Sequence, residues 1–239
     1  MTTAAVDKPQ AIMDACMLSA AGAAVFLLLP MVVGTAIDSL GYSESEAGFL
    51  ASSYFAGYML SATSAFFWIR KISWRVIAFL GYAGLSGGLA SAAALTHFNL
   101  IASTLFISGC GAGALFGLGV TIISDTRKPD RNFGLVLMTQ QATAALLLFT
   151  LPDTVIAKWG FAGLNISLAM ILGLFVISAT WIPAVAVSGK SFTPDHPSDR
   201  TTLTSKLWLG LAALTVYFAA LSGVWAFVER LADHNDLST

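Results

Sequence analysis

Two tyrosines spaced four residues apart are the strongest candidates for ligand binding in this sequence. Tyr54 and Tyr58 lie in an apolar stretch, and the i, i+4 spacing places both on one face of a helix. Their hydroxyls can hydrogen-bond a polar solute while their rings stack on an apolar one. The same spacing is also compatible with hydrogen bonding between helices, so both interpretations stay open.

Four further side chains complete the set of substrate-lining candidates. Polar groups inside a membrane are costly, and they therefore point to function. Because Gln140 and Gln141 are consecutive, their amides cannot both point in one direction. Trp225 either lines an outer vestibule together with Glu229 or anchors the end of its helix. The four are Ser108, Gln140, Gln141 and Trp225.

Charged groups are absent from the centres of the apolar stretches. Asp14 and Asp153 lie near the ends of their stretches, where water or lipid headgroups are within reach. A proton pathway built as a charge relay therefore has little to work with.

No pattern of catalytic or metal-binding residues is present in the sequence. The histidines fall in loops or at the tail, and the cysteines, Cys16 and Cys110, fall in apolar stretches as packing residues. A Walker motif, a serine elbow and zinc-type spacing are all missing. The last apolar stretch lacks the buried lysine of a retinal protein. We therefore expect no enzymatic activity, no metal and no cofactor.

Composition places these residues in a membrane. Of 239 residues, 56% are hydrophobic and only 10% are charged, whereas a soluble domain is about 25% charged. The net charge is −1 and there is no basic cluster, so nucleic acid is not an expected partner. The fold class predicted is an all-α integral membrane protein whose principal partner is the lipid bilayer.

Seven stretches are long and apolar enough to span a bilayer, which takes about 20 residues. The first is too long for a signal peptide and lacks a convincing cleavage site. Short loops join the stretches, except for the polar segment 189–205 with Pro194 and Pro197, which indicates a flexible connector. The spans are predicted at 12–36, 46–68, 74–96, 100–124, 133–156, 161–188 and 206–228.

The basic residues predict the orientation. With the N-terminus in the cytoplasm, ten of the 12 Lys and Arg residues face inward, and only Lys158 and Arg230 lie outside. The reverse topology would contradict the positive-inside rule. We therefore expect a multi-pass protein of the cell (inner or plasma) membrane.

Small residues and prolines suggest how the spans pack. Gly109, Gly113 and Gly117 repeat every four residues and form a smooth stripe, which predicts close packing within the chain or, alternatively, a dimer interface. Pro30 and Pro183 lie inside the first and sixth spans, where each removes one backbone hydrogen bond and invites a kink.

Several segments together resemble the amino-terminal half of a major facilitator superfamily (MFS) transporter. Six spans precede a longer cytoplasmic loop. The run AGFLASSYFAGYMLSATSAFFWIRKISWR (47–75) is similar to that family's second span and basic loop. The Gly-rich run LFISGCGAGALFGLGVTIISDTRKPDR (105–131) is similar to its fourth span, and YFAALSGVWAFVERLADHNDLS (217–238) to its seventh.

The sequence departs from the family pattern at identifiable positions. Arg70 stands where the second-to-third loop usually has an aspartate, so the acidic partner is lost there. Leu105 replaces an arginine that proton antiporters use in coupling, and the fifth span lacks the glycine-proline motif of drug antiporters. Drug antiport is therefore not supported.

The resemblance implies a secondary active transporter that moves a small solute by alternating access. It implies a six-span bundle over 1–188, a linker over 189–205, and a seventh span with an outer tail over 206–239 that begins a second half. It also implies a cytoplasmic gate, although the same charges fit an ordinary interfacial cluster. The gate candidates are Arg70, Arg75, Asp125 and Arg127.

Two further possibilities follow from the span count. Transporters of this superfamily typically have twelve spans, so seven predict either a fragment or a chain that assembles with a second copy or with the missing carboxy-terminal half. The alternative function is a non-transporting membrane scaffold or an inactive truncated product.

Overall fold

Apolar runs interrupted by proline, serine and glycine produce a succession of helices in the computed structural model. The structure describes residues 6–182 and the helical positions 209–210, 212–213, 216–217 and 220, and every regular element in these residues is a helix. The chain divides into two units, Met1–Ser188 and Gly189–Thr239. The elements of the first unit are α1 (Pro9–Leu27), α2 (Leu29–Leu40), α3 (Glu44–Trp68), α4 (Trp74–Ala94), α5 (Phe98–Ser124), α6 (Pro129–Leu151), the π-helix η2 (Pro152–Ile156), α7 (Ala157–Leu174) and the 3₁₀-helix η3 (Phe175–Thr180).

Several of these helices have the length and hydrophobicity of membrane spans. Four helical stretches in the described part of the chain qualify, namely Pro9–Leu27, Trp74–Ala94, Phe98–Ser124 and the continuous stretch Pro129–Thr180. The last has 52 residues and reverses direction within itself, so it covers the predicted fifth span and the sixth as far as Thr180. This agrees with a membrane protein. The count of seven spans stays a prediction, and the seventh falls mostly outside the described residues.

The predicted second span is a long helix that falls short of the hydrophobicity of the four stretches above. α3 has 25 residues, which is long enough to cross a bilayer, but it is not among the four apolar stretches. Its sequence is rich in serine, glycine and tyrosine. Ser52 and Ser53 each donate a hydrogen bond to the backbone carbonyl four residues earlier, which satisfies these hydroxyls within the helix.

Local chemistry accounts for the breaks and turns. The first span breaks at Leu28, two residues before Pro30, as the missing proline N–H predicts. Ser43 and Glu46 form a capping box at the start of α3. Gly160 adopts φ +51°, a left-handed conformation that reverses the chain between η2 and the body of α7. The second predicted kink, at Pro183, lies outside the described residues.

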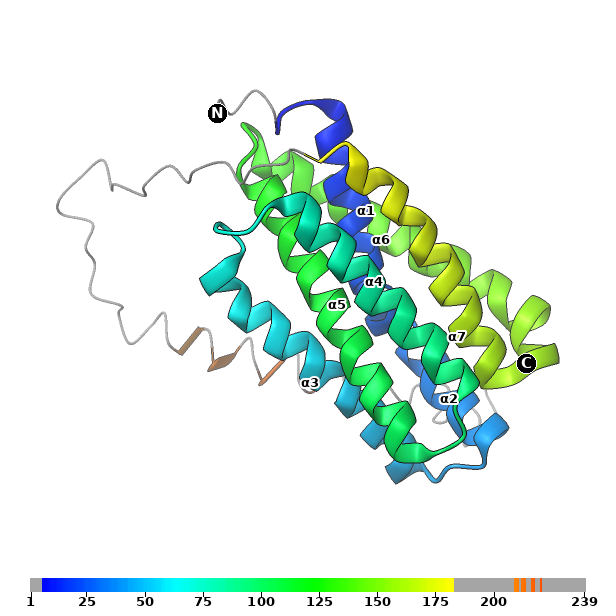
Figure 1. The fold of residues 1–239 in the computed structure, drawn as a ribbon. Helices are drawn as coiled ribbons and strands as arrows, with labels where there is room; N and C mark the ends of the chain where they lie inside the picture. The colour runs from blue at the N-terminus through cyan, green and yellow to red at the C-terminus, as the bar shows by residue number, and fades with distance from the viewer. Residues whose placement is uncertain (1–5, 183–208, 211, 214–215, 218–219, 221–239) are drawn as a thin grey trace. The chain divides into compact units, whose positions relative to one another are not determined.

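Helix α5 is the centre of the first unit. Figure 1 shows α5 running through the bundle with α3 and α4 beside it, and α3, α4 and α1 make its most extensive contacts. α6 packs on α1, and α7 packs on α4.

Glycines allow the close approach of these helices. Gly109 and Gly113 face the α3 backbone at Tyr54 and Tyr58, while Gly111 faces α4. Gly117, the third member of the predicted stripe, faces Ala65 and Ile69 at the end of α3. The glycine stripe therefore packs within the chain, as predicted.

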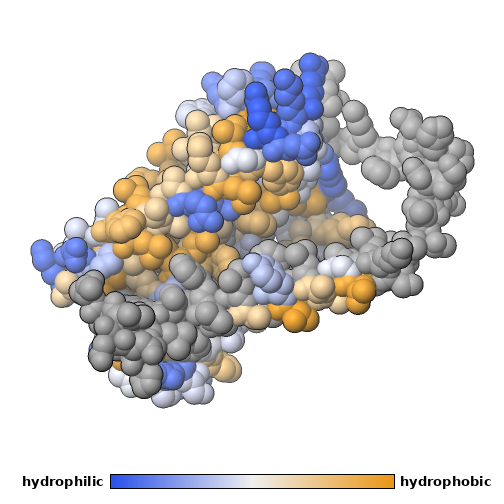
Figure 2. Space-filling model, turned by 180° about the vertical axis from the view of Figure 1, so that it is seen from behind, coloured by the Kyte–Doolittle hydropathy of each residue, from blue (hydrophilic) through white to orange (hydrophobic). Residues whose placement is uncertain are grey.

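The surface of the unit has the character of a lipid-facing bundle. Large apolar side chains project outward, including Phe66 and Phe149, which are 86% and 83% exposed. Figure 2 shows hydrophobic side chains across the middle of one face and hydrophilic ones gathered towards its ends. Hydrocarbon around the middle accounts for this distribution, since water would penalise it.

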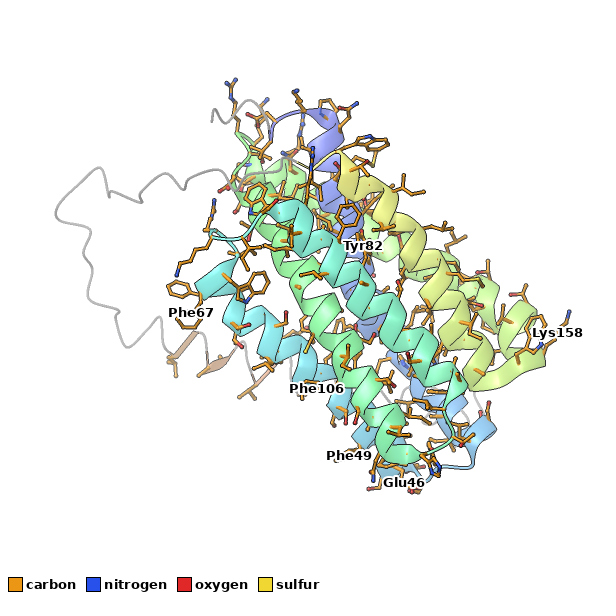
Figure 3. All side chains as sticks on the ribbon, viewed as in Figure 1. Glu46, Phe49, Phe67, Tyr82, Phe106 and Lys158 are labelled. Carbon is orange, nitrogen blue, oxygen red and sulfur yellow. The ribbon has the colours of Figure 1, made fainter. Side chains whose placement is uncertain are left out.

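The helices alternate in direction, so the loops collect at two ends. We call the end where α1, α4 and α6 begin and α3 and α5 finish the basic end, since it holds Arg70, Arg75, Arg127 and Lys128. Glu46 and Lys158 lie at the opposite end, as Figure 3 shows. The separation of the basic residues onto one end agrees with the predicted loop pattern.

Candidate functional site

Aromatic side chains from three helices meet between α1, α3 and α5. We call Phe26, Tyr54, Phe55, Tyr58 and Phe116 the aromatic cluster. Phe26 of α1 meets Phe55 edge-on with 5.9 Å between ring centroids, and Tyr58 meets Phe116 of α5 at 6.0 Å. Tyr54 and Phe55 are also edge-on, at 5.6 Å. Such geometries suit aromatic rings, because the edge of one ring carries positive charge and the face of the next negative charge.

The two tyrosines of the cluster lie near the middle of α3. Tyr54 and Tyr58 are about 15 Å and about 21 Å from the start of α3, at a rise of about 1.5 Å per residue. Phe26 is one residue from the end of α1 and borders the break at Leu28. Interrupted helices at mid-membrane depth are characteristic of solute-binding sites in transporters. The site therefore combines aromatic surface with a local interruption of the backbone.

The two tyrosines differ in accessibility. Tyr58 is half-buried, whereas Tyr54 is 2% exposed and its hydroxyl has no hydrogen-bond partner among the described residues. A buried hydroxyl without a partner costs about 1–3 kcal/mol. Proteins seldom retain such a group, so the Tyr54 hydroxyl stands out as an unsatisfied polar atom within the aromatic cluster.

The remaining candidates do not join the cluster as a group. Ser108 is buried and donates a hydrogen bond to the Leu85 carbonyl of α4 at 3.1 Å, which joins α5 to α4. Gln140 is buried and Gln141 exposed, in line with their predicted divergence. Both lie about 16–18 Å into α6, in its middle rather than near the basic end. Trp225 lies outside the described residues.

Two hollows on the surface border α5 without including these residues. One, of about 550 Å³, lies between α3 and α5 near Phe49, Ser53 and Phe106. Another, of about 400 Å³, is lined by apolar side chains of α3, α4 and α5 together with Cys110. Neither is lined by Tyr54 or Tyr58, so the aromatic cluster is a separate feature.

The predicted gate residues form specific links at the basic end. Arg70 follows α3, and its guanidinium makes two hydrogen bonds to the carboxylate of Asp125, which caps α5, at 2.6 Å and 2.9 Å. This hydrogen bonding raises the pKa of Arg70 above its usual value. The sequence alone suggested that the basic loop had lost its acidic partner. Asp125, 55 residues away, supplies one.

The other two arginines also bind across the bundle end. Arg127 forms an ion pair with Asp7 at 3.1 Å, and its backbone N–H donates to the same carboxylate at 2.8 Å. The Arg75 Nε donates to the Ile182 carbonyl beyond η3 at 2.7 Å. The links of the four gate candidates therefore involve five parts of the chain: the segment before α1, the end of α3, the start of α4, the loop after α5 and the segment after η3.

Sequence reasoning misjudged one acidic residue. Asp14 was expected to lie where water or headgroups are in reach, but it is 0% exposed in the interior of the bundle. Neither carboxyl oxygen has a hydrogen-bond partner among the residues that the structure describes. Its place near the start of the predicted span 12–36 suggested access to the interface. The packing of neighbouring helices around α1 removes that access.

A scan of the sequence against protein-family models gives no match, and a search of curated proteins finds no significantly similar sequence.

Proposed function

We propose that this chain is an MFS-type membrane transporter, or a fragment of one, that moves a small solute across a cell membrane by alternating access. The observation that carries the proposal is a symmetry in the packing of the first unit. The helices form two groups of three passes. The first group is α1 continued by α2, then α3, then α4. The second group is α5, then α6, then α7 continued by η3.

Exchanging the two groups reproduces the packing. The exchange pairs α1 and α2 with α5, α3 with α6, and α4 with α7 and η3. The contact of α3 with α5 thus corresponds to the contact of α6 with α1. The contact of α4 with α5 corresponds to the contacts of α7 with α2 and of η3 with α1. The α1–α5 and α4–α7 contacts map onto themselves. Corresponding helices run in opposite directions, because each group has three helical passes.

Such inverted three-plus-three repeats are a property of MFS halves. A random arrangement of six passes would rarely have every major contact preserved by one exchange. The packing therefore supports the resemblance seen in the sequence, and it does so independently of any motif.

The functional residues follow from this proposal. Tyr58 presents its ring to the solute, and the Tyr54 hydroxyl donates a hydrogen bond to a polar solute atom. The links at the basic end, led by Arg70–Asp125, hold that end closed on the cytoplasmic side. A second bundle, from another copy or from a carboxy-terminal half, completes the pathway in this proposal.

Solute uptake into proteoliposomes tests the proposal. The full chain is reconstituted and supplied with radiolabelled sugars, amino acids and monocarboxylates, each against protein-free liposomes. We expect at least one class to enter faster with protein. If none does, the non-transporting scaffold becomes the better description.

Removing the Tyr54 hydroxyl separates binding from stability. Because that hydroxyl has no partner in the described structure, Tyr54→Phe should not destabilise the protein, and it should raise the free energy of unfolding by up to the cost of burying the unpaired hydroxyl, about 1–3 kcal/mol. Uptake should nevertheless fall several-fold. Tyr42→Phe is the matched control and should leave uptake unchanged. Tyr42 packs on Phe98 at the end of the bundle away from the basic end, outside the aromatic cluster. Equal uptake by all three proteins would exclude the Tyr54 hydroxyl from the solute site.

A further inference from the structure

Asp14 is the one acidic side chain in the described residues that lies fully buried. It is 0% exposed, and both carboxyl oxygens are shielded from solvent and lack hydrogen bonds. It lies about 7–8 Å from the start of α1. Helices α5 and α6 and the 3₁₀-helix η3 pack around α1.

Within residues 6–182, the elements packed around α1 contain few charged side chains that could balance a carboxylate at Asp14. α5 has no charged residue, and neither has η3. On α6 the charged residues are Asp130 and Arg131 in the first turn, and on α4 the charged residue is Arg75, which binds the Ile182 carbonyl. α2 has Asp38 near its far end.

The other titratable groups near this region are neutral. Tyr82 of α4 is buried close to Asp14, and Figure 3 shows its ring between α4 and α7. Its hydroxyl has no hydrogen bond of good geometry, although the Ser178 hydroxyl of η3 lies near it. Cys16, on α1 itself, lies close to Thr139 of α6. Cys110 on α5 lines the hollow beside α3 and α4 instead.

An ionised carboxylate in such a place is costly. Removing an ion from water carries an effective penalty of several kcal/mol unless a counter-ion compensates it. A neutral carboxyl group avoids most of this penalty, so protonation is the favoured state. A metal ion is a poor alternative, because the described residues contain no cluster of three His, Cys, Asp or Glu side chains.

We propose that Asp14 is a reversible proton-binding site, occupied by a proton while α5, α6 and η3 are packed around α1. The carboxyl group takes its proton from water and returns it to water, and no other bond changes. Release requires solvent to reach the site. The links Asp7–Arg127 and Arg75–Ile182 close the basic end beside it, so they must loosen first.

Tyr82 acts as a positioning residue in this proposal. After solvent enters, its hydroxyl can donate to the ionised carboxylate, and this lowers the cost of releasing the proton. Coupling of this proton to solute movement rests on the proposed transport function. Proton binding itself does not, and it is measured without any solute.

Infrared difference spectroscopy of the full chain in lipid nanodiscs tests the proposal. A protonated carboxyl group has a C=O stretching band that a carboxylate lacks. At neutral pH we expect this band in the wild-type protein and its loss in Asp14→Asn, which replaces the neutral acid with a group of the same shape. Asp153→Asn is the matched control, because Asp153 is exposed at the opposite end and should leave the band unchanged.

A second measurement covers the case in which Asp14→Asn fails to fold. The wild-type protein is prepared with isotope-labelled aspartate, and its protonated-carboxyl band is followed as the pH is raised. The same pH titration is then carried out on Tyr82→Phe. We expect the band to persist to higher pH in Tyr82→Phe, because the carboxylate loses a donor. A transport-inactive protein that still has the band would contradict the proposed function and leave the proton site intact.

Two results would overturn the proposal. The first is a wild-type protein without a protonated-carboxyl band at neutral pH, which would show that Asp14 is ionised. The second is loss of the band on adding sodium ions at constant pH, which would identify a cation site instead.

Discussion

Two adjacent glycines on α4 provide a sharp test of the helix packing. Gly88 is buried against α5, and a Cβ at this position would lie 2.6 Å from the Thr104 carbonyl oxygen and 2.8 Å from the Ser108 amide nitrogen. Gly87 is exposed, and a Cβ there would meet nothing within 4 Å. Alanine therefore adds the same methyl group at both positions, with opposite consequences.

The expected difference follows from the available space. At Gly88 the new contacts are shorter than an ordinary contact of 3.4 Å by about 0.6–0.8 Å, and they involve backbone atoms that cannot rotate away. Overpacking of this kind costs about 1–3 kcal/mol. The helix propensity of alanine offsets up to about 1 kcal/mol.

The neighbouring hydrogen bond adds to the cost at Gly88. Ser108 donates to the Leu85 carbonyl at 3.1 Å, and separation of α4 from α5 would weaken this bond, which is worth about 0.6 kcal/mol in a membrane. We therefore expect Gly88→Ala to destabilise the protein by about 2 kcal/mol, or about thirtyfold in the unfolding equilibrium. Gly87→Ala should equal the wild type or be up to about 1 kcal/mol more stable.

Unfolding in mixed micelles with increasing sodium dodecyl sulfate, followed by circular dichroism, measures both variants. The comparison is internal, since both variants share the helix and the added group. Equal midpoints for Gly87→Ala and Gly88→Ala would refute the described approach of α4 to α5.

Two further predictions concern the links and turns of the first unit. Arg70→Asp and Asp125→Arg should each destabilise the fold by only about 0.5–1 kcal/mol, because Arg70 is partly exposed. In a double-mutant cycle, the variant with both changes should recover most of this loss, whereas additive losses would contradict a direct ion pair. Gly160→Ala should cost about 2–4 kcal/mol in the same unfolding assay, because its φ of +51° strains an L-residue and its Cβ would lie 2.8 Å from the Ser39 Cβ. Gly41→Ala, at φ +69° but with open space around it, should cost only about 1–2 kcal/mol, and a loss equal to that of Gly160→Ala would show that contact with Ser39 is unimportant.

Local properties of the chain were predictable from sequence. Uninterrupted apolar runs require helices in lipid, because each backbone group must find its partner within the segment. The break near Pro30 follows from a missing N–H, and the packing role of Gly109 and Gly113 follows from their spacing. These features depend on residues within a few turns of one another, so the sequence contains their causes.

The partners of polar groups were not predictable in the same way. Arg70 meets Asp125 across 55 residues, and Arg127 meets Asp7 across 120. Ser108 could equally have faced a solute, and only the position of α4 directs its hydroxyl to Leu85. Such contacts depend on how helices are arranged around α5, which no local pattern specifies.

Asp14 shows the difference most clearly. The sequence by itself determined that a carboxyl group lies near the start of the first apolar stretch, and distance along the chain suggested access to water. Only the tertiary structure decided that α5, α6 and η3 enclose α1 at that level. Whether a carboxyl group is solvated depends on what surrounds it in three dimensions, and its depth along one helix does not determine that.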